Sequence, residues 1–290
     1  MATAASPRRR FSAFVGVLPF FVFAIIFLAL PVGFLVIGSF IDAETGQLTT
    51  ANYGALSRPV IVEAYATSIE ISAVTAIGGG IFGFLLAYAV ILGGLPKFLR
   101  TALLTFSGVA SNFAGVPLAL AFIFTLGQIG LVSRLLDDLF GFSLRQSGFS
   151  LYTKLGLELT YMYFQFPLMI LIIAPAIDGL KKDWREAAEN MGASGAQYWR
   201  HIALPILLPS LLGTVILLFG NAFGAQATAF QLTGGTINLV TILIGIQMTG
   251  DVLHNPGLGY SLAMGMVAIM GVSIGIYSLL QRRSERWLRS

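Results

Sequence analysis

The sequence predicts an all-α membrane protein with six transmembrane helices. Its composition, the length of its apolar stretches and the position of its charges all indicate this fold class. Of the 290 residues, 56% are hydrophobic and only 10% are charged, whereas a soluble domain carries about 25% charged residues. So few charges cannot cover a globular surface in water, and most of the chain is therefore expected to face lipid.

Six apolar stretches are long enough to cross a bilayer, whose core of about 30 Å needs about 20 helical residues. They lie at residues 11–40, 64–95, 101–126, 152–177, 206–230 and 258–280. The first follows Arg8, Arg9 and Arg10 as a signal peptide would, but it exceeds the roughly 7–15 apolar residues of a signal sequence. We therefore expect an uncleaved first span. Residues 231–257 are expected to form either an irregular, partly inserted segment or a short outer helix on the bundle.

The basic residues predict the orientation of the chain. Thirteen of the 17 lie between alternate spans or at the termini, in residues 8–10, 97–100, 181–200 and 282–289. Arg58, Arg134, Arg145 and Lys154 fall on the other side. The positive-inside rule then predicts that both termini and the loop 178–205 are cytoplasmic. Because the basic residues flank apolar runs, they do not indicate a nucleic-acid partner.

No pattern in the sequence predicts an enzyme. The chain has no cysteine, which excludes disulfides and cysteine-ligated metals. Its two histidines, His201 and His254, have no metal-ligand spacing, and no GxxxxGK[ST] sequence is present to hold nucleotide phosphates. No catalytic residue, metal site or resident cofactor is therefore expected.

The charged segment REAAENMGASGAQYWRHIALP, residues 185–205, lies between two apolar runs. Asp183 with Glu186 has the spacing of a capping box, and Ser194 with Gln197 repeats it. Gly192 between them can take the positive φ that ends a helix. The segment is therefore predicted to form two short helices joined by a turn.

The first of these helices has an apolar stripe with the spacing i, i+3, i+4, i+7, formed by Trp184, Ala187, Ala188 and Met191. The centre of the stripe is small, and the opposite face is not basic as it would be on a lipid-surface helix. We therefore expect this helix to lie in a groove of a partner protein.

The same segment resembles the EAA loop of the inner-membrane permease subunits of binding-protein-dependent ABC importers. That pattern is Glu-Ala-Ala, a Gly four positions after the last Ala, and Ile-x-Leu-Pro after nine more residues. The matching residues here are Glu186, Ala187, Ala188, Gly192, Ile202, Leu204 and Pro205. The stretches ATSIEISAVTAIGGGIFGFLLAYAV and SNFAGVPLALAFIFTLGQIGLVSRLL are similar to the family's second and third spans. The resemblance implies a type I importer permease fold over residues 1–290, in the inner (plasma) membrane, with a cytoplasmic coupling helix in loop 178–205.

The resemblance also implies partners. They are a cytoplasmic ATPase dimer that binds ATP and Mg²⁺, an extracytoplasmic substrate-binding protein, and a second permease subunit, either a different homologous chain or a copy of this one. The residues implied to contact the ATPase are Asp183, Glu186, Ala187, Ala188, Met191, Gly192 and Ala193. A secondary transporter or channel without an ATPase is the alternative, but it should contain more intramembrane charges than this chain has.

Residues 234–266 most resemble permeases of the spermidine/putrescine type, which implies a small polar solute of polyamine type. Candidate residues for a translocation path are polar positions in the spans, namely Glu70, Asn112, Tyr161, Gln165, Asn221 and Gln226. Each polar residue could instead bond neighbouring helices, and Glu70 and Glu158 could be interfacial or ion-paired acids. On one helix Asn221 and Gln226 would be about 140° apart, so only one of the two would face a path.

Overall fold

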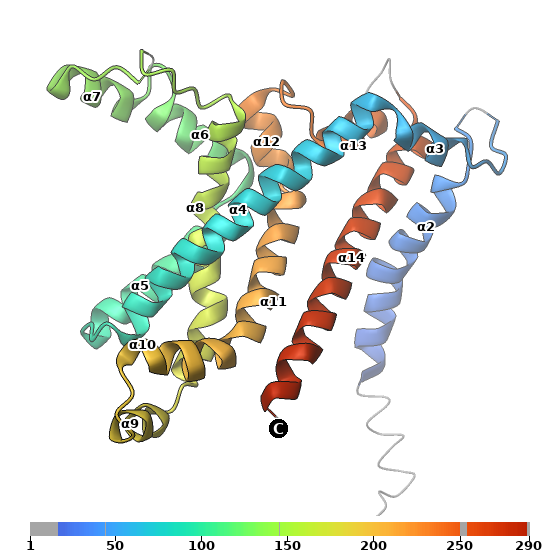
Figure 1. The fold of residues 1–290 in the computed structure, drawn as a ribbon. Coiled ribbons are helices and arrows are strands. Elements are labelled where there is room, and N and C mark those ends of the chain that lie inside the picture. The colour runs from blue at the N-terminus through green and yellow to red at the C-terminus, as the bar shows by residue number, and fades with distance from the viewer. Residues whose placement is uncertain (1–16, 44, 145, 250–253, 289–290) are drawn as a thin grey trace, which may run out of the picture. The chain divides into compact units, whose positions relative to one another are not determined.

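The computed structural model describes residues 17–43, 45–144, 146–249 and 254–288, and its architecture is helical (Figure 1). Within these ranges the only β pairing is the isolated bridge between Ile41 and Leu48. Arg8, Arg9, Arg10, Arg145 and Arg289, used above to predict orientation, lie outside the described residues, as does the start of the first predicted span. The prediction of an all-α fold is confirmed.

Six helical stretches of the described chain are long and apolar enough to cross a membrane, as predicted. They are Val17–Ser39, Pro59–Leu92, Gly115–Phe140, Lys154–Asp178, Gly195–Phe223 and Pro256–Arg282. Their bounds differ from the predicted ones chiefly in the third and fifth stretches, where helix breaks divide the chain.

The predicted third span, residues 101–126, is two helices, α5 (Lys97–Asn112) and α6 (Gly115–Leu126). Ala114 between them is extended and Gly115 has φ of +73°, a conformation that glycine takes without the steric cost of a side chain. After α6 the chain breaks again before α7 (Leu131–Phe140), so the apolar range Gly115–Phe140 contains two helices.

The predicted fifth span, residues 206–230, is likewise divided. It comprises α11 (Leu204–Phe223) and α12 (Gln226–Thr233), with the break at residues 224–225. Within residues 231–257 the structure has the apolar helix α13 (Val240–Thr249). Residues 240–249 of that segment are therefore helical and not irregular.

The chain forms two compact units. Unit 1 holds residues up to 58 and residues 244–267, including a π-helical turn η1 (Ile25–Ala29), α2 (Leu30–Ser39), α3 (Ala51–Gly54), the 3-10 turn η2 (Ala55–Ser57) and the start of α14 (Pro256–Leu288). Buried Asn52 organises it, because its Nδ2 donates to the carbonyls of Ser39 (3.1 Å) and Ile41 (3.0 Å). Its own carbonyl accepts from the hydroxyl of Ser261 at the start of α14 (3.3 Å).

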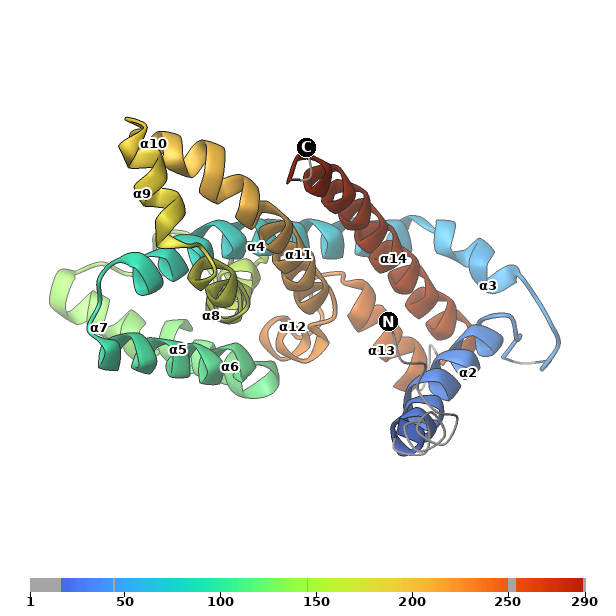
Figure 2. The same ribbon diagram turned by 90° about the horizontal axis from the view of Figure 1, so that it is seen from below.

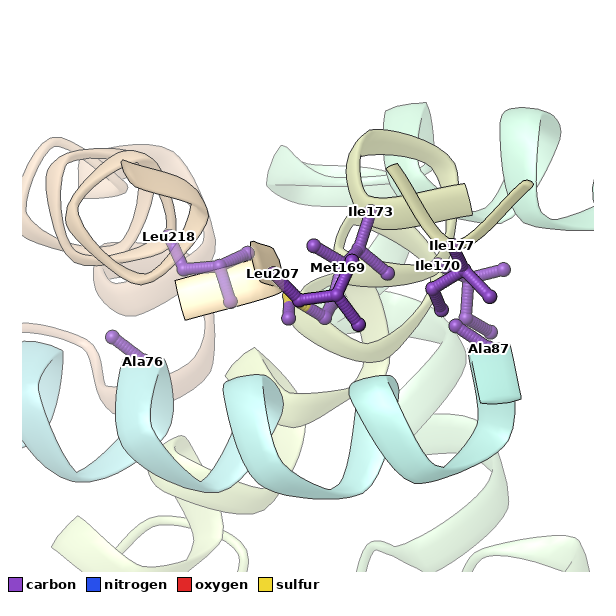
Figure 3. Close-up of a cluster of buried hydrophobic side chains, with 8 residues drawn as sticks. All are labelled: Ala76, Ala87, Met169, Ile170, Ile173, Ile177, Leu207 and Leu218. Carbon is purple, nitrogen blue, oxygen red and sulfur yellow. The ribbon is translucent and has the colours of Figure 1, made fainter. Parts of the chain in front are cut away.

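Unit 2 holds residues 59–243 and the end of α14. Its core lies where α4 (Pro59–Leu92), α8 (Lys154–Asp178) and α11 pack side by side (Figure 2). Figure 3 shows the buried cluster that these three helices share, formed by Ala76, Ala87, Met169, Ile170, Ile173, Ile177, Leu207 and Leu218. Between membrane helices such close packing, rather than exclusion of water, supplies much of the association energy.

Glycines of α4 allow this close packing. A methyl group at Gly79 would stand 2.6 Å from Cβ of Gln165, and one at Gly83 would stand 2.6 Å from Cβ of Met169. Both distances are too short for real atoms. The two pairs are each four residues apart on their helices, so α4 and α8 approach along one small-residue ridge.

The two ends of unit 2 carry different elements (Figure 1). The helices α9 (Lys182–Asn190) and α10 (Gly195–Tyr198) lie at the end where α5 begins and α8 finishes, which we call the α9 end. The helices α7 and α12 and the start of α8 lie at the opposite end, which we call the α12 end.

Candidate coupling site

The local structure of residues 181–203 is two short helices and a turn, as the sequence predicts. Ser194 and Gln197 form the predicted capping box: the Gln197 N–H donates to Ser194 Oγ (3.3 Å) and the Ser194 N–H donates to Gln197 Oε1 (2.7 Å). Gly192 has φ of +81° and ends the turn after α9.

The other predicted capping box, Asp183 with Glu186, is wrong. The helix α9 begins two residues earlier than that box requires, with Lys181 at the N-cap and Asp183 inside the first turn. No side chain caps the helix. The carboxylate of Asp183 still stabilises this end, because negative charge near a helix N-terminus interacts favourably with the helix dipole.

The segment has a small core of its own, built on buried Ala188, Tyr198 and Ala203, against which Trp184 and Ile202 pack. The predicted stripe therefore does not form one partner-facing surface. Trp184 and Ala188 face this core, whereas Ala187 and Met191 are exposed, Met191 to 80%. The reason is that the return of the chain through α10 covers half of the stripe, which spacing within α9 alone does not reveal.

What remains exposed is a compact surface on α9 and the turn after it. Of the seven residues implied to contact an ATPase, Asp183, Glu186, Ala187, Met191 and Gly192 are exposed, Ala193 is half-buried and Ala188 is buried. Next to them is a shallow pocket of about 320 Å³, lined by residues including Met191, Gly192, Ala193 and His201. We call the exposed residues 183, 186, 187, 191 and 192 the α9 surface.

Charge on α9 is partly paired within the helix. Arg185 Nε donates to Glu189 Oε1 at 2.9 Å, one turn along. The hydrogen bond and charge of Glu189 raise the pKa of the Arg185 guanidinium, which stays protonated. Glu186 is also exposed and is not part of this ion pair. Its carboxylate can therefore pair with a basic group of a partner protein without breaking the bond between Arg185 and Glu189.

An aromatic contact joins this segment to α4. The residues Trp199–Ala203 form a π-helical turn, η3, directly before α11. Such turns recur at functional sites, and here Pro205 lacks the N–H that a regular helix would offer to His201. From η3 the Trp199 ring lies edge-to-face against Tyr88 (centroids 5.1 Å apart) and against Phe84 (6.4 Å). Sequence reasoning missed this role of Trp199, because its partners are more than 100 residues away.

A salt bridge also ties helices together at the α9 end. Arg100 at the start of α5 donates through Nη2 to both carboxylate oxygens of Asp178, the last residue of α8, at 2.7 and 2.6 Å. It joins α5 to α8, and the Trp199 contact joins the segment 181–203 to α4. The only sequence signal was an acid and a base at the ends of separate spans.

Two of the predicted path residues bond α8 to the end of α11. The hydroxyl of Tyr161 donates to the carbonyl of Ala225 (2.6 Å), and Nε2 of Gln165 donates to the carbonyl of Leu218 (3.0 Å). Both side chains are buried. In this structure they act as interhelical bonds, the alternative that the sequence left open.

Glu70 is ion-paired, which was the alternative for this acid. It pairs with Lys154 at the start of α8, and Glu158 lies within electrostatic reach of both groups. The lysine and the two glutamates therefore form a shared cluster at the α12 end, in which Lys154 neutralises part of the negative charge.

The remaining candidates flank the two helix breaks. Asn112 ends α5, and Asn221 and Gln226 lie on either side of the break between α11 and α12; all three are exposed. The geometry predicted for Asn221 and Gln226 is wrong, because they belong to different helices.

The two breaks are bonded to each other. The Gly115 N–H donates to Thr228 Oγ1 (2.8 Å), and the Thr228 hydroxyl donates back to the Gly115 carbonyl (3.3 Å). Polar residues that are far apart in sequence are thus gathered around one joined pair of breaks. Non-helical backbone at membrane depth is tolerated where protein buries it or where it lines a water-filled cavity.

Comparisons with known proteins agree on one family. The profile of the family described as "Binding-protein-dependent transport system inner membrane component" matches residues 79–290. A probable sulfate transport system permease protein cysT of Chlorella vulgaris is 29% identical over 168 residues, which cover 57% of this chain and 59% of that protein. The sulfate transport system permease protein CysT of Salmonella typhimurium is 27% identical over 214 residues, covering 73% and 72%.

A spermidine/putrescine transport system permease protein, PotB of Haemophilus influenzae, is 27% identical over 137 residues, covering 46% of this chain and 47% of that protein. The chain thus spans less than two thirds of the length of some of these relatives. Among solved structures, a bacterial ABC transporter involved in the import of the acidic polysaccharide alginate has the same fold, with a TM-score of 0.74 at 16% identity, over 95% of this chain and 96% of that one.

Proposed function

The chain belongs to the family of inner membrane components of binding-protein-dependent transport systems, and as such is a permease subunit of an ABC importer; on this premise we propose how it is coupled to ATP hydrolysis. The α9 surface docks into a groove of a cytoplasmic ATPase subunit, which binds the ATP and Mg²⁺. The observation that carries the proposal is the folded segment 181–203, which presents small exposed residues while its own core and the Trp199 ring hold it against the spans.

The coupling is mechanical. A transporter responds to a ligand only through the different affinities of its two states for that ligand. Closure of the ATPase dimer on ATP would move the α9 surface, and the ring of Trp199 would pass that movement to Tyr88 and Phe84 of α4. The bond between Arg100 and Asp178 would carry α5 and α8 with it. A folded segment transmits such a displacement, whereas a flexible loop would absorb it.

We propose that the α9 end is cytoplasmic, with both termini on that side. The basic residues Lys97, Arg100, Lys182 and Arg200 belong to elements at the α9 end of unit 2, whereas α7 with Arg134 and the start of α8 with Lys154 lie at the other end. This asymmetry supports the orientation through the positive-inside rule.

Single cysteines test the orientation, because the chain contains none of its own. Ser194→Cys and Ser147→Cys place exposed thiols in the loops before α10 and α8 respectively. In intact cells an impermeant maleimide should label position 147 and should reach position 194 only after permeabilisation. The reverse labelling pattern would invert the topology and remove the coupling proposal.

For the translocation path, we propose that Asn112, Asn221 and Gln226 line it, near the joined helix breaks. Their exposure supports this assignment, whereas Tyr161 and Gln165 hold α11 in place. A thiol reagent should modify Asn221→Cys faster during transport than at rest, and added substrate should protect it. Leu217→Cys, on the same helix and 58% exposed, is the matched control and should show neither effect.

The substrate that we propose is a small polar or charged solute delivered by an extracytoplasmic binding protein, with a second permease subunit completing the pore. The sulfate-named relative matches 214 residues and the polyamine-named one 137, and Glu70, the acid first considered for a polyamine cation, is paired with Lys154. Sulfate is therefore the first substrate to test and polyamine the second. Calorimetric titration of the cognate binding protein with sulfate and with spermidine distinguishes them.

The partners are tested by purification. A tag on this chain, after mild solubilisation, should retain an ATPase and a second permease, and the purified assembly should hydrolyse ATP faster when the loaded binding protein is added. Recovery of this chain alone as an active transporter would contradict the importer mechanism proposed here.

A further inference from the structure

The helix α7 is sharply divided into an apolar and a polar side. Leu131, Leu135 and Leu139 lie at i, i+4 and i+8 along one side, with Val132, Leu136 and Phe140 next to them. Ser133, Arg134, Asp137 and Asp138 occupy the remaining arc. An amphipathic helix normally turns its apolar side to the protein core, so the direction of this side is informative.

The apolar side of α7 faces away from the protein. Leu131 is 63% exposed, Leu139 is 70% exposed and Phe140 is 75% exposed. The buried residue of the helix is Ser133, on the polar side, whose hydroxyl donates to the carbonyl of Gly127 (2.8 Å). The helix is thus fastened through its polar side and presents its leucines outwards.

The polar side of α7 borders a hydrophilic cavity of about 670 Å³. Arg134 and Asp137 line it together with Gln128, Gln146 and Ser150. Water or polar groups therefore suit one side of the helix, and only an apolar medium suits the other.

The position of α7 along the chain excludes a further membrane crossing. The helices α5 and α6 have 16 and 12 residues and rise about 24 Å and 18 Å, so residues 97–126 are already long enough to cross a bilayer core of about 30 Å. The helix α7 follows at the α12 end, where α8 also begins (Figure 1). Its ten residues rise about 15 Å, half of the bilayer core, so it lies at the membrane boundary or beyond it.

The exposed apolar surface continues along the chain from a membrane-spanning helix into α7. Phe124 near the end of α6 is 68% exposed and Ile129 in the connection is 77% exposed, directly before Leu131. Phe124 lies in α6, within an apolar helical stretch long enough to cross a membrane. The leucines of α7 extend that surface and require the same surroundings.

We propose that α7 lies in the membrane interface at the α12 end, with Leu131, Leu135 and Leu139 among the lipid acyl chains and its polar side towards the aqueous cavity. The helix carries one base and two acids, so its attachment comes from apolar burial and not from attraction to anionic lipid. It anchors the floor of the hydrophilic cavity in the bilayer surface.

Site-directed spin labelling tests this placement. Leu135→Cys and the matched Asp137→Cys each give one labelling site in this cysteine-free chain, on the two sides of α7. The full chain, purified with the subunits that assemble with it, is reconstituted in vesicles of phosphatidylethanolamine and phosphatidylglycerol. Collisions of each label with oxygen, which concentrates in lipid, and with a water-soluble nickel chelate are compared.

We expect the label at position 135 to collide several-fold more often with oxygen than the label at 137 does, at a depth of about 5–10 Å below the headgroups. The label at 137 should favour the nickel chelate. Nickel access at position 135 would place α7 in water, and protection from both reagents would show that a protein partner covers the stripe; either result overturns the proposal. If Leu135→Cys does not assemble, a label at Leu139→Cys on the same apolar side provides the same comparison of oxygen and nickel collisions.

Discussion

The ring of Trp199 lies edge-to-face against the ring of Tyr88, with centroids 5.1 Å apart and planes inclined by 83°. One residue belongs to the π-helical turn after α10 and the other to the last two turns of α4. Trp199 also packs against the hydrophobic cluster shared by α4, α8 and α11. This contact joins the segment that carries the α9 surface to the spanning helix α4.

Replacing Trp199 by alanine should uncouple transport from ATP hydrolysis. An aromatic pair contributes about 0.5–1.5 kcal/mol beyond its buried area, so the subunits should still assemble while displacement of the α9 surface no longer reaches α4. Transport in proteoliposomes should fall by up to about tenfold, since 1.4 kcal/mol corresponds to a factor of ten, with ATPase activity retained. Trp199→Phe should restore part of the transport, and Tyr88→Phe, which keeps the ring, is the control. Equal loss of both activities in Trp199→Ala would indicate a purely structural role.

Substituting Gly192 should weaken docking of the ATPase. Its φ of +81° costs an L-residue about 1–2 kcal/mol, although a methyl group there would meet no atom within 4 Å. The matched control is Gly195→Ala, which also has open space around it but does not need a positive φ. Gly192→Ala should lower the amount of ATPase that co-purifies, and Gly195→Ala should not. Identical recovery for the two variants would show that the turn is not part of the docking surface.

Reversing the charge of Glu186 should have a related effect without backbone strain. Its exposed carboxylate lies outside the pair of Arg185 with Glu189, so Glu186→Lys removes an acid and places a base before the partner. We expect normal membrane insertion and loss of ATP-driven transport. Glu189→Gln, which removes the ion pair with Arg185 instead, should change transport little. A stronger effect from Glu189→Gln than from Glu186→Lys would show that the partner contacts Glu189 and not Glu186.

Breaking the bond between Arg100 and Asp178 should loosen α5 from α8 at the α9 end. The side chains of Arg100 and Asp178 are 36% and 48% exposed, and exposed ion pairs contribute about 0–1 kcal/mol. Arg100→Ala and Asp178→Ala should each lower the thermal stability of the purified complex slightly. A double-mutant cycle measures their coupling; a coupling energy of zero would reduce the bridge to a surface contact.

Enlarging Gly83 should destabilise the packing of α4 against α8. An added methyl would stand 2.6 Å from Cβ of Met169 and 3.0 Å from the Phe166 carbonyl, and overpacking of this kind costs about 1–3 kcal/mol. Gly83→Val should lower the unfolding midpoint, whereas Gly108→Ala in α5, where no atom lies within 4 Å, should change it little. A stable Gly83→Val variant would mean that the two helices separate at low cost.

Several features of the chain follow from residues that act locally or by composition. The low charge content and the six long apolar stretches establish a helical membrane bundle, because only backbone that satisfies its own hydrogen bonds can cross lipid. The turn and second short helix of residues 181–203 follow from spacing: Ser194 and Gln197 can cap only the helix that begins between them, and Gly192 marks the turn.

The helix breaks, the inward side of α9 and the partners of polar residues depend on tertiary structure. The hydrophobicity of an apolar run does not show whether the run forms one helix or two. The breaks before Gly115 and after Phe223 are held by hydrogen bonds to Thr228 and Tyr161, which lie elsewhere in the chain. Ala188 is buried because the chain returns over it through Tyr198. Composition thus determines which segments enter the membrane, and residue spacing determines which segments form short helices. Contacts between distant residues decide which side of each helix is covered, since burial depends on what the rest of the chain places against it.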